Sequence, residues 1–130
     1  MILLDTDVCI EILRGNTKVL EHLSLAQETA CISFMTVSEL YYGAEKSNQV
    51  EKNKTNIERF LLATVVWEST IHILKKFGEL KAKLDKTGNL IEDADLFIAA
   101  TSLTHCKYLV TGNVKHYQRI PELEIRNWIR

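Results

Sequence analysis

The sequence begins Met1-Ile2-Leu3-Leu4-Asp5-Thr6-Asp7, and the fold that we expect follows from this stretch. Three consecutive apolar residues followed by an acid predict a short buried strand that carries Asp5 at its carboxyl end. Residues 8–13 then have apolar side chains at helical spacing, and Gly15 is a typical helix stop. Asp5 and Asp7 therefore lie where a strand turns into a helix, which is where open α/β sheets keep their functional groups.

Apolar runs alternate with segments of helical periodicity along the rest of the chain. The polar segment 47–56 leads into a helix that is expected to pack beside the preceding one as a hairpin. We expect strands at 30–34, 64–67, 108–111 and 124–126, helices at 17–27, 36–46, 69–86 and from 92 onward, and a short polar turn or helix at 114–119. This alternation predicts an α/β fold, with a central, mostly parallel sheet of four to five short strands flanked by helices.

Composition limits the class of protein. A chain of 130 residues is expected to be a single domain, residues 1–130, and its formal net charge of −1 excludes a strongly basic surface over the whole molecule. No signal peptide or membrane-spanning run is recognisable, so we expect a cytoplasmic protein without membrane contact. Cys9, Cys31 and Cys106 are odd in number and widely spaced, which favours reduced thiols in a core over a zinc site or a disulfide framework.

Polar residues follow several predicted strands or open the helices after them. In a parallel sheet these positions gather along one edge. Carboxylates crowded there need a counter-charge, and a hard cation such as Mg²⁺ or Mn²⁺ is the simplest one. The residues concerned are Asp5 with Asp7, Glu39, Asp93 with Asp95, and Thr111 with Asn113.

Helix capping is an alternative reading for each acid taken singly. Thr36-Val37-Ser38-Glu39 matches the capping-box pattern, which would start a helix at Thr36 and place Glu39 in its first turn. Asp7 and Asp93 are interpreted mainly as helix caps. Asp95 differs, because it shares the helical register of the apolar residues that follow it, and a carboxylate on an inward face requires a partner.

Four motifs follow one another along the chain. They are Leu3-Leu4-Asp5-Thr6-Asp7, Ser38-Glu39-Leu40-Tyr41-Tyr42-Gly43, Asp93-Ala94-Asp95-Leu96-Phe97-Ile98-Ala99-Ala100 and Val110-Thr111-Gly112-Asn113-Val114-Lys115-His116-Tyr117. In this order they resemble the motifs of PIN-domain ribonucleases, and the chain is more closely similar to the VapC toxins of toxin–antitoxin pairs. The resemblance runs from the first residue to Ile120-Pro121 and Asn127-Trp128.

The resemblance assigns roles to the acids. Asp5, Glu39 and Asp95 match the metal-binding catalytic acids of the family, whereas Asn113 stands where a fourth acid is common and Asp7 where asparagine is usual. We rank Asn113 as the fourth site residue, above Asp7. Asp7, Asp93 and Thr111 are candidates for a supporting role.

The resemblance also implies an activity and partners. It predicts Mg²⁺-dependent hydrolysis of RNA phosphodiesters, with transfer RNA as the preferred substrate and inhibition of translation as the result. It further implies a homodimer and a VapB antitoxin whose tail covers the acids, so that any DNA contact belongs to the antitoxin. Basic residues near the predicted site are candidates for binding the RNA backbone: Arg14, Lys46, Lys54, Lys115, His116 and Arg119.

Two other functions fit parts of the sequence. Asp5-Thr6-Asp7 after a strand also resembles the nucleophile and acid of haloacid dehalogenase-type phosphatases. That reading leaves Glu39 without a role, and 130 residues are short for such an enzyme. The second alternative is a non-catalytic PIN-like module that only binds a partner, although the three principal acids are intact.

Overall fold

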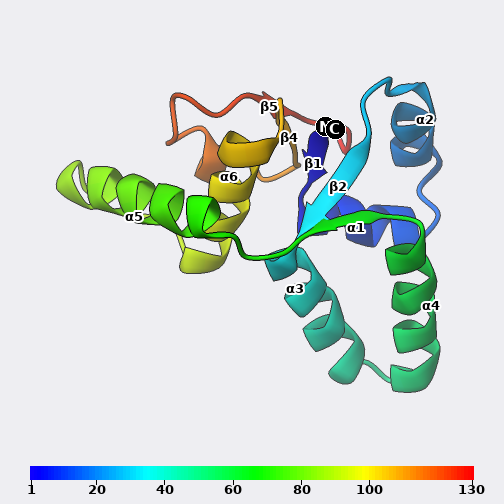
Figure 1. Cartoon of the computed structure of the whole chain (residues 1–130). Coiled ribbons are helices and arrows are strands. Elements are labelled where there is room, and N and C mark those ends of the chain that lie inside the picture. Colours follow the sequence, from blue (N-terminus) through cyan, green and yellow to red (C-terminus); the bar gives the residue numbers. More distant parts are fainter.

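Five short strands form one parallel sheet with helices on both faces (Figure 1). The computed structural model describes all 130 residues. The elements, in chain order, are β1 (Ile2–Leu4), α1 (Thr6–Leu13), α2 (Thr17–Leu25), β2 (Ala30–Ser33), α3 (Phe34–Glu45), α4 (Val50–Leu62), β3 (Val65–Trp67), α5 (Ile71–Lys86), α6 (Asp93–His105), β4 (Leu109–Val110), α7 (Val114–Tyr117) and β5 (Ile125–Arg126). The predicted α/β fold is confirmed, and all four strand pairings are parallel.

The first strand lies at the centre of the sheet, in the order β3-β2-β1-β4-β5. Leu3 pairs with Cys31 on one side and with Leu109 on the other. Because the chain leaves β1 in both directions to build the rest of the sheet, β1 is a topological switch point, and the crevice at its carboxyl end is the expected place for a site.

The two faces of β1 enter two separate parts of the core. Leu3 packs with side chains of α5 and α6, including Ile73 and Leu96, whereas Ile2 and Leu4 pack with side chains of α1 to α4. All three strand residues are almost completely buried, as expected of a run that is covered on both faces. No helix is long and apolar enough to cross a membrane.

The helix that carries Glu39 begins earlier than predicted. Ser33 caps α3 by accepting a hydrogen bond from the backbone N–H of Thr36, and Phe34 is already helical. The capping-box prediction was therefore wrong, and Glu39 lies in the second turn of α3. The hydroxyl of Thr36 is buried and contacts the hydroxyl of Thr6 at 3.0 Å, so it is not a cap.

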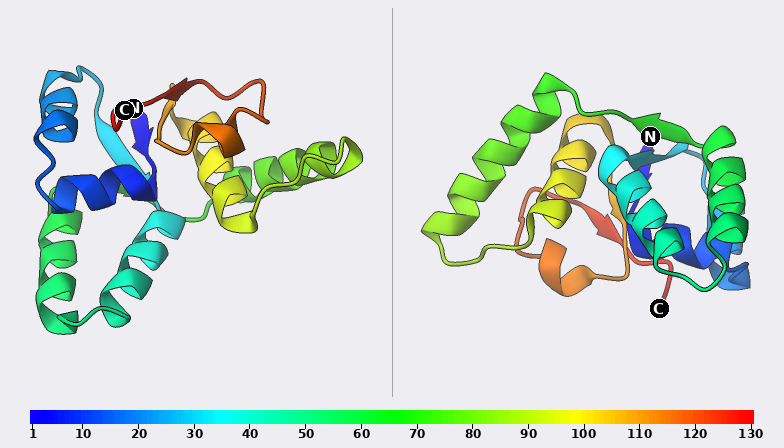
Figure 2. Two further views of the ribbon diagram at one scale, coloured as in Figure 1. Left: turned by 180° about the vertical axis from the view of Figure 1, so that it is seen from behind. Right: turned by 90° about the horizontal axis from the view of Figure 1, so that it is seen from below.

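Helices α3 and α4 form the predicted hairpin, which projects beyond the carboxyl edge of the sheet (Figure 2). Helix α1 lies beside both of them. On the opposite face, α5 packs against α6. The carboxyl end of β1 is thus bordered by the hairpin on one side and by the beginning of α6 on the other.

Candidate active site

A pocket of about 420 Å³ opens at the carboxyl end of β1. We call it the acidic pocket, because four carboxylates line it. The structure brings together Asp5, Glu39, Asp95 and Asn113 from four separate segments of the chain. The full lining is Asp5, Thr6, Asp7, Ile10, Glu39, Asp95, Gly112, Asn113 and Arg130.

Asp5 is the most buried of these acids, with 5% of its surface exposed. One carboxylate oxygen accepts a hydrogen bond from the backbone N–H of Thr6 at 2.8 Å, and the other accepts one from the hydroxyl of Thr111 at 2.7 Å. Burial, and secondarily the negative charge of Asp7, raises the pKa of Asp5 to about 7. Thr111 therefore lies beneath the acidic pocket, where it orients Asp5 without lining the pocket itself.

Glu39 and Asp5 are joined through Thr6. The hydroxyl of Thr6 donates a hydrogen bond to the Glu39 carboxylate at 2.7 Å, while the backbone N–H of Thr6 binds Asp5. A single residue at the start of α1 thus fixes carboxylates from β1 and α3. These two hydrogen bonds from Thr6 restrict the rotamers of both acids before any ligand binds.

Asp95, in the first turn of α6, is held by α7. The Nδ1 atom of His116 lies 3.1 Å from one Asp95 oxygen, and the hydroxyl of Tyr117 donates to the other at 3.3 Å. Burial, together with the charges of Asp5 and Asp95, raises the pKa of Tyr117 well above its usual range, so its hydroxyl remains a donor. The same His116 atom lies 2.9 Å from the side-chain nitrogen of Asn113, which links that residue to the cluster.

The predicted capping roles of Asp7 and Asp93 were wrong. Helix α1 begins at Thr6 because Asp5 is its N-cap, so Asp7 is already inside the helix. Asp7 instead accepts hydrogen bonds from the N–H groups of Val8 and Gly112, which ties α1 to the loop after β4. Asp93 is the first residue of α6, makes no capping bond and pairs with Lys81 at 3.0 Å, outside the acidic pocket.

Sequence reasoning missed Arg130 and misjudged His116. Arg130 lines the acidic pocket and donates a hydrogen bond to the carbonyl of Gly112 at 2.9 Å. Nothing in its sequence context indicates that contact. His116 was considered only as a contact for the RNA backbone, although its spacing of one helical turn from Asn113 was a usable signal. Three of the other proposed RNA contacts are already engaged: Lys54 pairs with Glu45 at 3.0 Å, Arg14 pairs with Glu11 at 3.4 Å, and Arg119 donates to the carbonyl of Leu90.

The donor set of the acidic pocket fits a hard divalent cation. No three acidic, histidine or cysteine side chains converge closely enough to form a ready-made metal site. However, four carboxylates face one arginine, and burial beside Asp7 raises the pKa of Asp5, which shows that its negative charge is poorly compensated. Carboxylate and amide oxygens are the ligands that Mg²⁺ and Mn²⁺ prefer.

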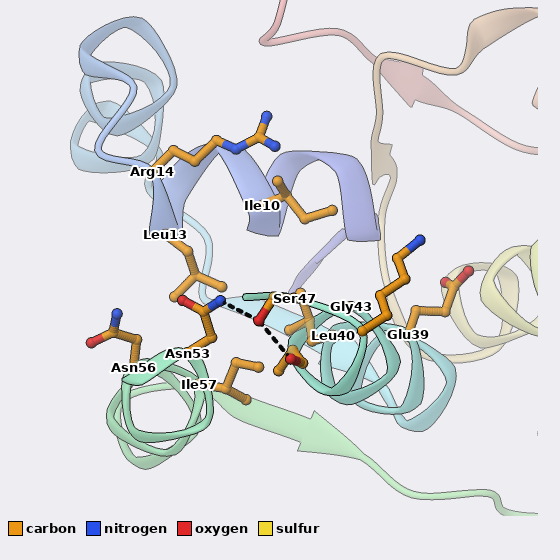
Figure 3. Close-up of a pocket in the computed structure, with 12 residues that line it drawn as sticks. Ile10, Leu13, Arg14, Glu39, Leu40, Gly43, Ser47, Asn53, Asn56 and Ile57 are labelled. Atoms are coloured by element: carbon orange, nitrogen blue, oxygen red, sulfur yellow. Dashed lines mark hydrogen bonds between the residues drawn. The ribbon is translucent and has the colours of Figure 1, made fainter. Parts of the chain in front are cut away.

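A second cavity, of about 490 Å³, lies between α1 and the α3–α4 hairpin (Figure 3). We call it the hairpin groove. It shares Ile10 and Glu39 with the acidic pocket, so the two cavities are neighbours. Arg14 and Lys46 also line the hairpin groove, and the side-chain amide of Asn53 donates to the hydroxyl of Ser47 at 2.8 Å within it.

Comparison with known proteins assigns the family. The model of the PIN domain matches residues 2–123. Ribonuclease VapC2 of Haemophilus influenzae is 37% identical over 130 residues, which cover 98% of this chain and 97% of the relative. The tRNA(fMet)-specific endonuclease VapC of Shigella flexneri is 32% identical, with 97% and 96% covered.

Solved structures give the same result. The crystal structure of VapBC2 from Rickettsia felis, bound to a DNA fragment from its promoter, matches with a TM-score of 0.92 at 31% identity, over 98% of this chain and 99% of the other. VapBC from Salmonella typhimurium, also bound to DNA, matches with a TM-score of 0.92 at 30% identity, over 98% and 97%. Fold, motif order and similarity over nearly the whole length agree, and the chain therefore belongs to the PIN-domain family and, within it, to the VapC ribonucleases.

Proposed function

We propose that this protein is a Mg²⁺-dependent endoribonuclease, with Mn²⁺ as an alternative ion, in which Asp5, Glu39 and Asp95 hold the metal and Asn113 completes the site. The observation that carries the proposal is that these four residues come from four distant segments and line one pocket at the carboxyl end of the central strand. The 130 residues would act as a single PIN domain.

The side chains around the acids have a defined task in this mechanism. The hydroxyl of Thr111 holds Asp5, the hydroxyl of Thr6 holds Glu39, and His116 with Tyr117 holds Asp95. Such fixed carboxylates keep the metal and the scissile phosphate in register. When bound, the ion supplies Lewis-acid activation of a water molecule and neutralises charge on the phosphate. No side-chain nucleophile is required.

Asp5 is poorly suited to the nucleophilic role that a phosphatase requires. Both of its oxygens already accept hydrogen bonds, and only 5% of the residue is exposed. A carboxylate oxygen that attacks phosphorus becomes part of an acyl phosphate, which would disrupt one of these hydrogen bonds. A metal ion can instead share an oxygen that already accepts one hydrogen bond, because each carboxylate oxygen has two lone pairs. The geometry therefore favours metal binding over covalent catalysis at this position.

The hairpin groove offers room for nucleotides next to the scissile phosphate. It adjoins the acidic pocket at Glu39, and Arg14 and Lys46 on its lining carry positive charge that suits the RNA backbone. Transfer RNA is the substrate that we propose, because one relative of nearly equal length is named a tRNA(fMet)-specific endonuclease. Cleavage of transfer RNA would inhibit translation. To reach this substrate, the protein would have to act in the cytoplasm.

An antitoxin partner follows from the same relationship. The similar solved structures include VapBC complexes, two of them bound to DNA. We propose that this chain forms a homodimer and binds a VapB-type antitoxin whose tail covers the acidic pocket with a basic side chain. Opposite charge suits a surface lined by four carboxylates. DNA would then be contacted through the antitoxin.

The test is cleavage of a total transfer RNA pool by the purified, antitoxin-free chain in Mg²⁺, with mapping of the ends formed. We expect discrete cuts that EDTA abolishes and that Asp5→Asn and Asp95→Asn lose. Asp93→Asn is the matched control, because Asp93 lies two residues from Asp95 on the same helix but outside the acidic pocket. It should cleave like the wild type.

Two results would contradict the proposal. Hydrolysis of small phosphate monoesters with a phosphoaspartate at Asp5 would support a phosphatase. Intact RNA of every class with a folded wild-type protein, combined with full antitoxin binding, would support a binding module.

A further inference from the structure

Two of the three cysteines lie in contact at the end of the sheet opposite the acidic pocket. The sulfur atoms of Cys31, on β2, and Cys106, directly after α6, are 3.4 Å apart, although 75 positions separate them in the sequence. Cys31 is completely buried, whereas Cys106 is partly exposed. A reagent that reaches Cys106 therefore meets a second thiol immediately behind it.

The surroundings of the pair favour reaction between the two sulfurs. The contact between the two sulfurs lowers the pKa of Cys31 and raises that of Cys106, so the pair loses its first proton from Cys31. The indole N–H of Trp67 is buried and makes no conventional hydrogen bond. Its ring is stacked on His105 at 3.7 Å, which closes the cluster on that side.

The third cysteine provides an internal contrast. Cys9, on α1, is completely buried and belongs to the part of the core on the other face of the sheet. Its sulfur lies 4.0 Å from the carbonyl of Leu4, and no thiol contacts it. Burial raises the pKa of its thiol well above the usual value. Cys9 thus lacks both the partner and the access that Cys106 has.

We propose that Cys31 and Cys106 are a site of reversible oxidation, at which a hydroperoxide converts the two thiols to an intramolecular disulfide. In the first step the proton of Cys106 passes to the thiolate of Cys31 across their contact, and the sulfur of Cys106, the one that solvent reaches, attacks the peroxide. The O–O bond breaks, Cys106 gains the hydroxyl, and the other oxygen leaves as water or alcohol with a proton from solvent. In the second step the sulfur of Cys31 attacks Cys106, the S–O bond breaks, and the hydroxyl leaves as water with the proton of Cys31. A thiol reductant reverses the reaction.

The geometry requires only a local movement. The sulfurs must approach from 3.4 Å to about 2.05 Å, which side-chain rotation at the partly exposed end of α6 can supply. The new bond would join β2 to the end of α6, whereas the acids lie at the end of β1 and the beginning of α6. We therefore expect it to restrict the unfolded chain and to raise the melting temperature by at least about 5 °C, without blocking the acidic pocket.

Mass spectrometry of the full-length protein tests the proposal independently of any RNA cleavage. The chain is treated with hydrogen peroxide, unfolded in denaturant so that every remaining thiol is accessible, alkylated, and analysed intact and after digestion. We expect a loss of two hydrogens, a peptide pair linked through Cys31 and Cys106, one alkylated cysteine at Cys9, and full reversal by dithiothreitol. Cys9→Ser should retain the link, and Cys106→Ser should lose it.

Three outcomes would overturn the proposal. One is oxidation of Cys106 to the sulfinic acid with no link to Cys31. The second is a link that involves Cys9, and the third is a disulfide between two copies of the chain, seen as a dimer on a non-reducing gel. Because the wild-type protein itself gives the decisive mass, a variant that fails to fold does not affect the test.

Discussion

Replacing Asp5 by asparagine should abolish RNA cleavage and yet make the metal-free protein more stable above neutral pH. The reason is that the folded state holds the Asp5 carboxyl in a buried position beside Asp7 and raises its pKa from 3.8 to about 7. The folded protein therefore keeps this proton at pH values where the unfolded chain has lost it. Its stability falls as the pH rises from about 4 to about 7, and the loss is complete above pH 7.

The size of the effect follows from the pKa and the contacts of Asp5. The rise from 3.8 to about 7 lowers the free energy of unfolding by about 4 kcal/mol at pH 8 and by about 1.5 kcal/mol at pH 5. Asparagine removes this cost but replaces the carboxyl group to which Thr6 and Thr111 are hydrogen-bonded, which costs about 1 to 2 kcal/mol at either pH. We expect Asp5→Asn to be more stable by about 2 kcal/mol at pH 8 and nearly equal to the wild type at pH 5.

Urea unfolding in the presence of EDTA measures this difference. With a slope of about 1.5 kcal/mol per molar urea, the midpoint of Asp5→Asn relative to the wild type should move by about 1.5 M between pH 5 and pH 8. Asp93→Asn, which removes an exposed carboxylate outside the acidic pocket, should show no such movement. If Asp5→Asn has the same midpoint difference from the wild type at both pH values, Asp5 does not carry the buried, poorly compensated charge that the structure indicates.

Three further predictions concern the same edge of the sheet. Mg²⁺ at 100 times its dissociation constant should raise the free energy of unfolding of the wild type by about 2.7 kcal/mol but leave Asp5→Asn unchanged in a thermal scan; an equal rise in both would place the ion elsewhere. Gly112→Ala should lower the free energy of unfolding in urea by about 1 to 3 kcal/mol, because the new Cβ would lie 2.9 Å from Ile129 and 3.0 Å from the Asp7 carboxylate. An unchanged midpoint would show that these two side chains move aside without cost. Ser33→Ala should lower the free energy of unfolding by about 1 kcal/mol, because it removes the cap of α3. A loss of stability in Thr36→Ala with none in Ser33→Ala would restore the capping-box interpretation.

Local patterns in the sequence predicted much of the fold. The apolar runs marked the strands, because a strand buried on both faces must be apolar throughout, and β1 delivers Asp5 at its carboxyl end as expected. The hairpin of α3 and α4 and the long α5 were likewise expected from helical spacing. These features depend on interactions between neighbours in the sequence or on simple burial.

The features that sequence reasoning missed depend on contacts between distant segments. Ser33 and Thr36 are both acceptable helix caps, and the choice between them is made by Thr6, which binds the Thr36 hydroxyl in the folded protein. Arg130 reaches the acidic pocket only because the chain after β5 returns to Gly112. No periodicity encodes such a contact.

The pairing of the first strand with the fourth also sets when the site can exist. Asp5 and its partner Thr111 are 106 positions apart, and β1 has β4 as a neighbour in the sheet. A ribosome that adds 5 to 20 residues per second needs roughly 5 to 20 s to travel from one to the other. During that interval the nascent chain contains Asp5 and, later, Glu39, but neither the hydroxyl that orients Asp5 nor the segment that carries Asn113. The acidic pocket can therefore assemble only after Thr111 and Asn113 have been synthesised, and the ribosome that makes the chain is not exposed to an assembled site before then.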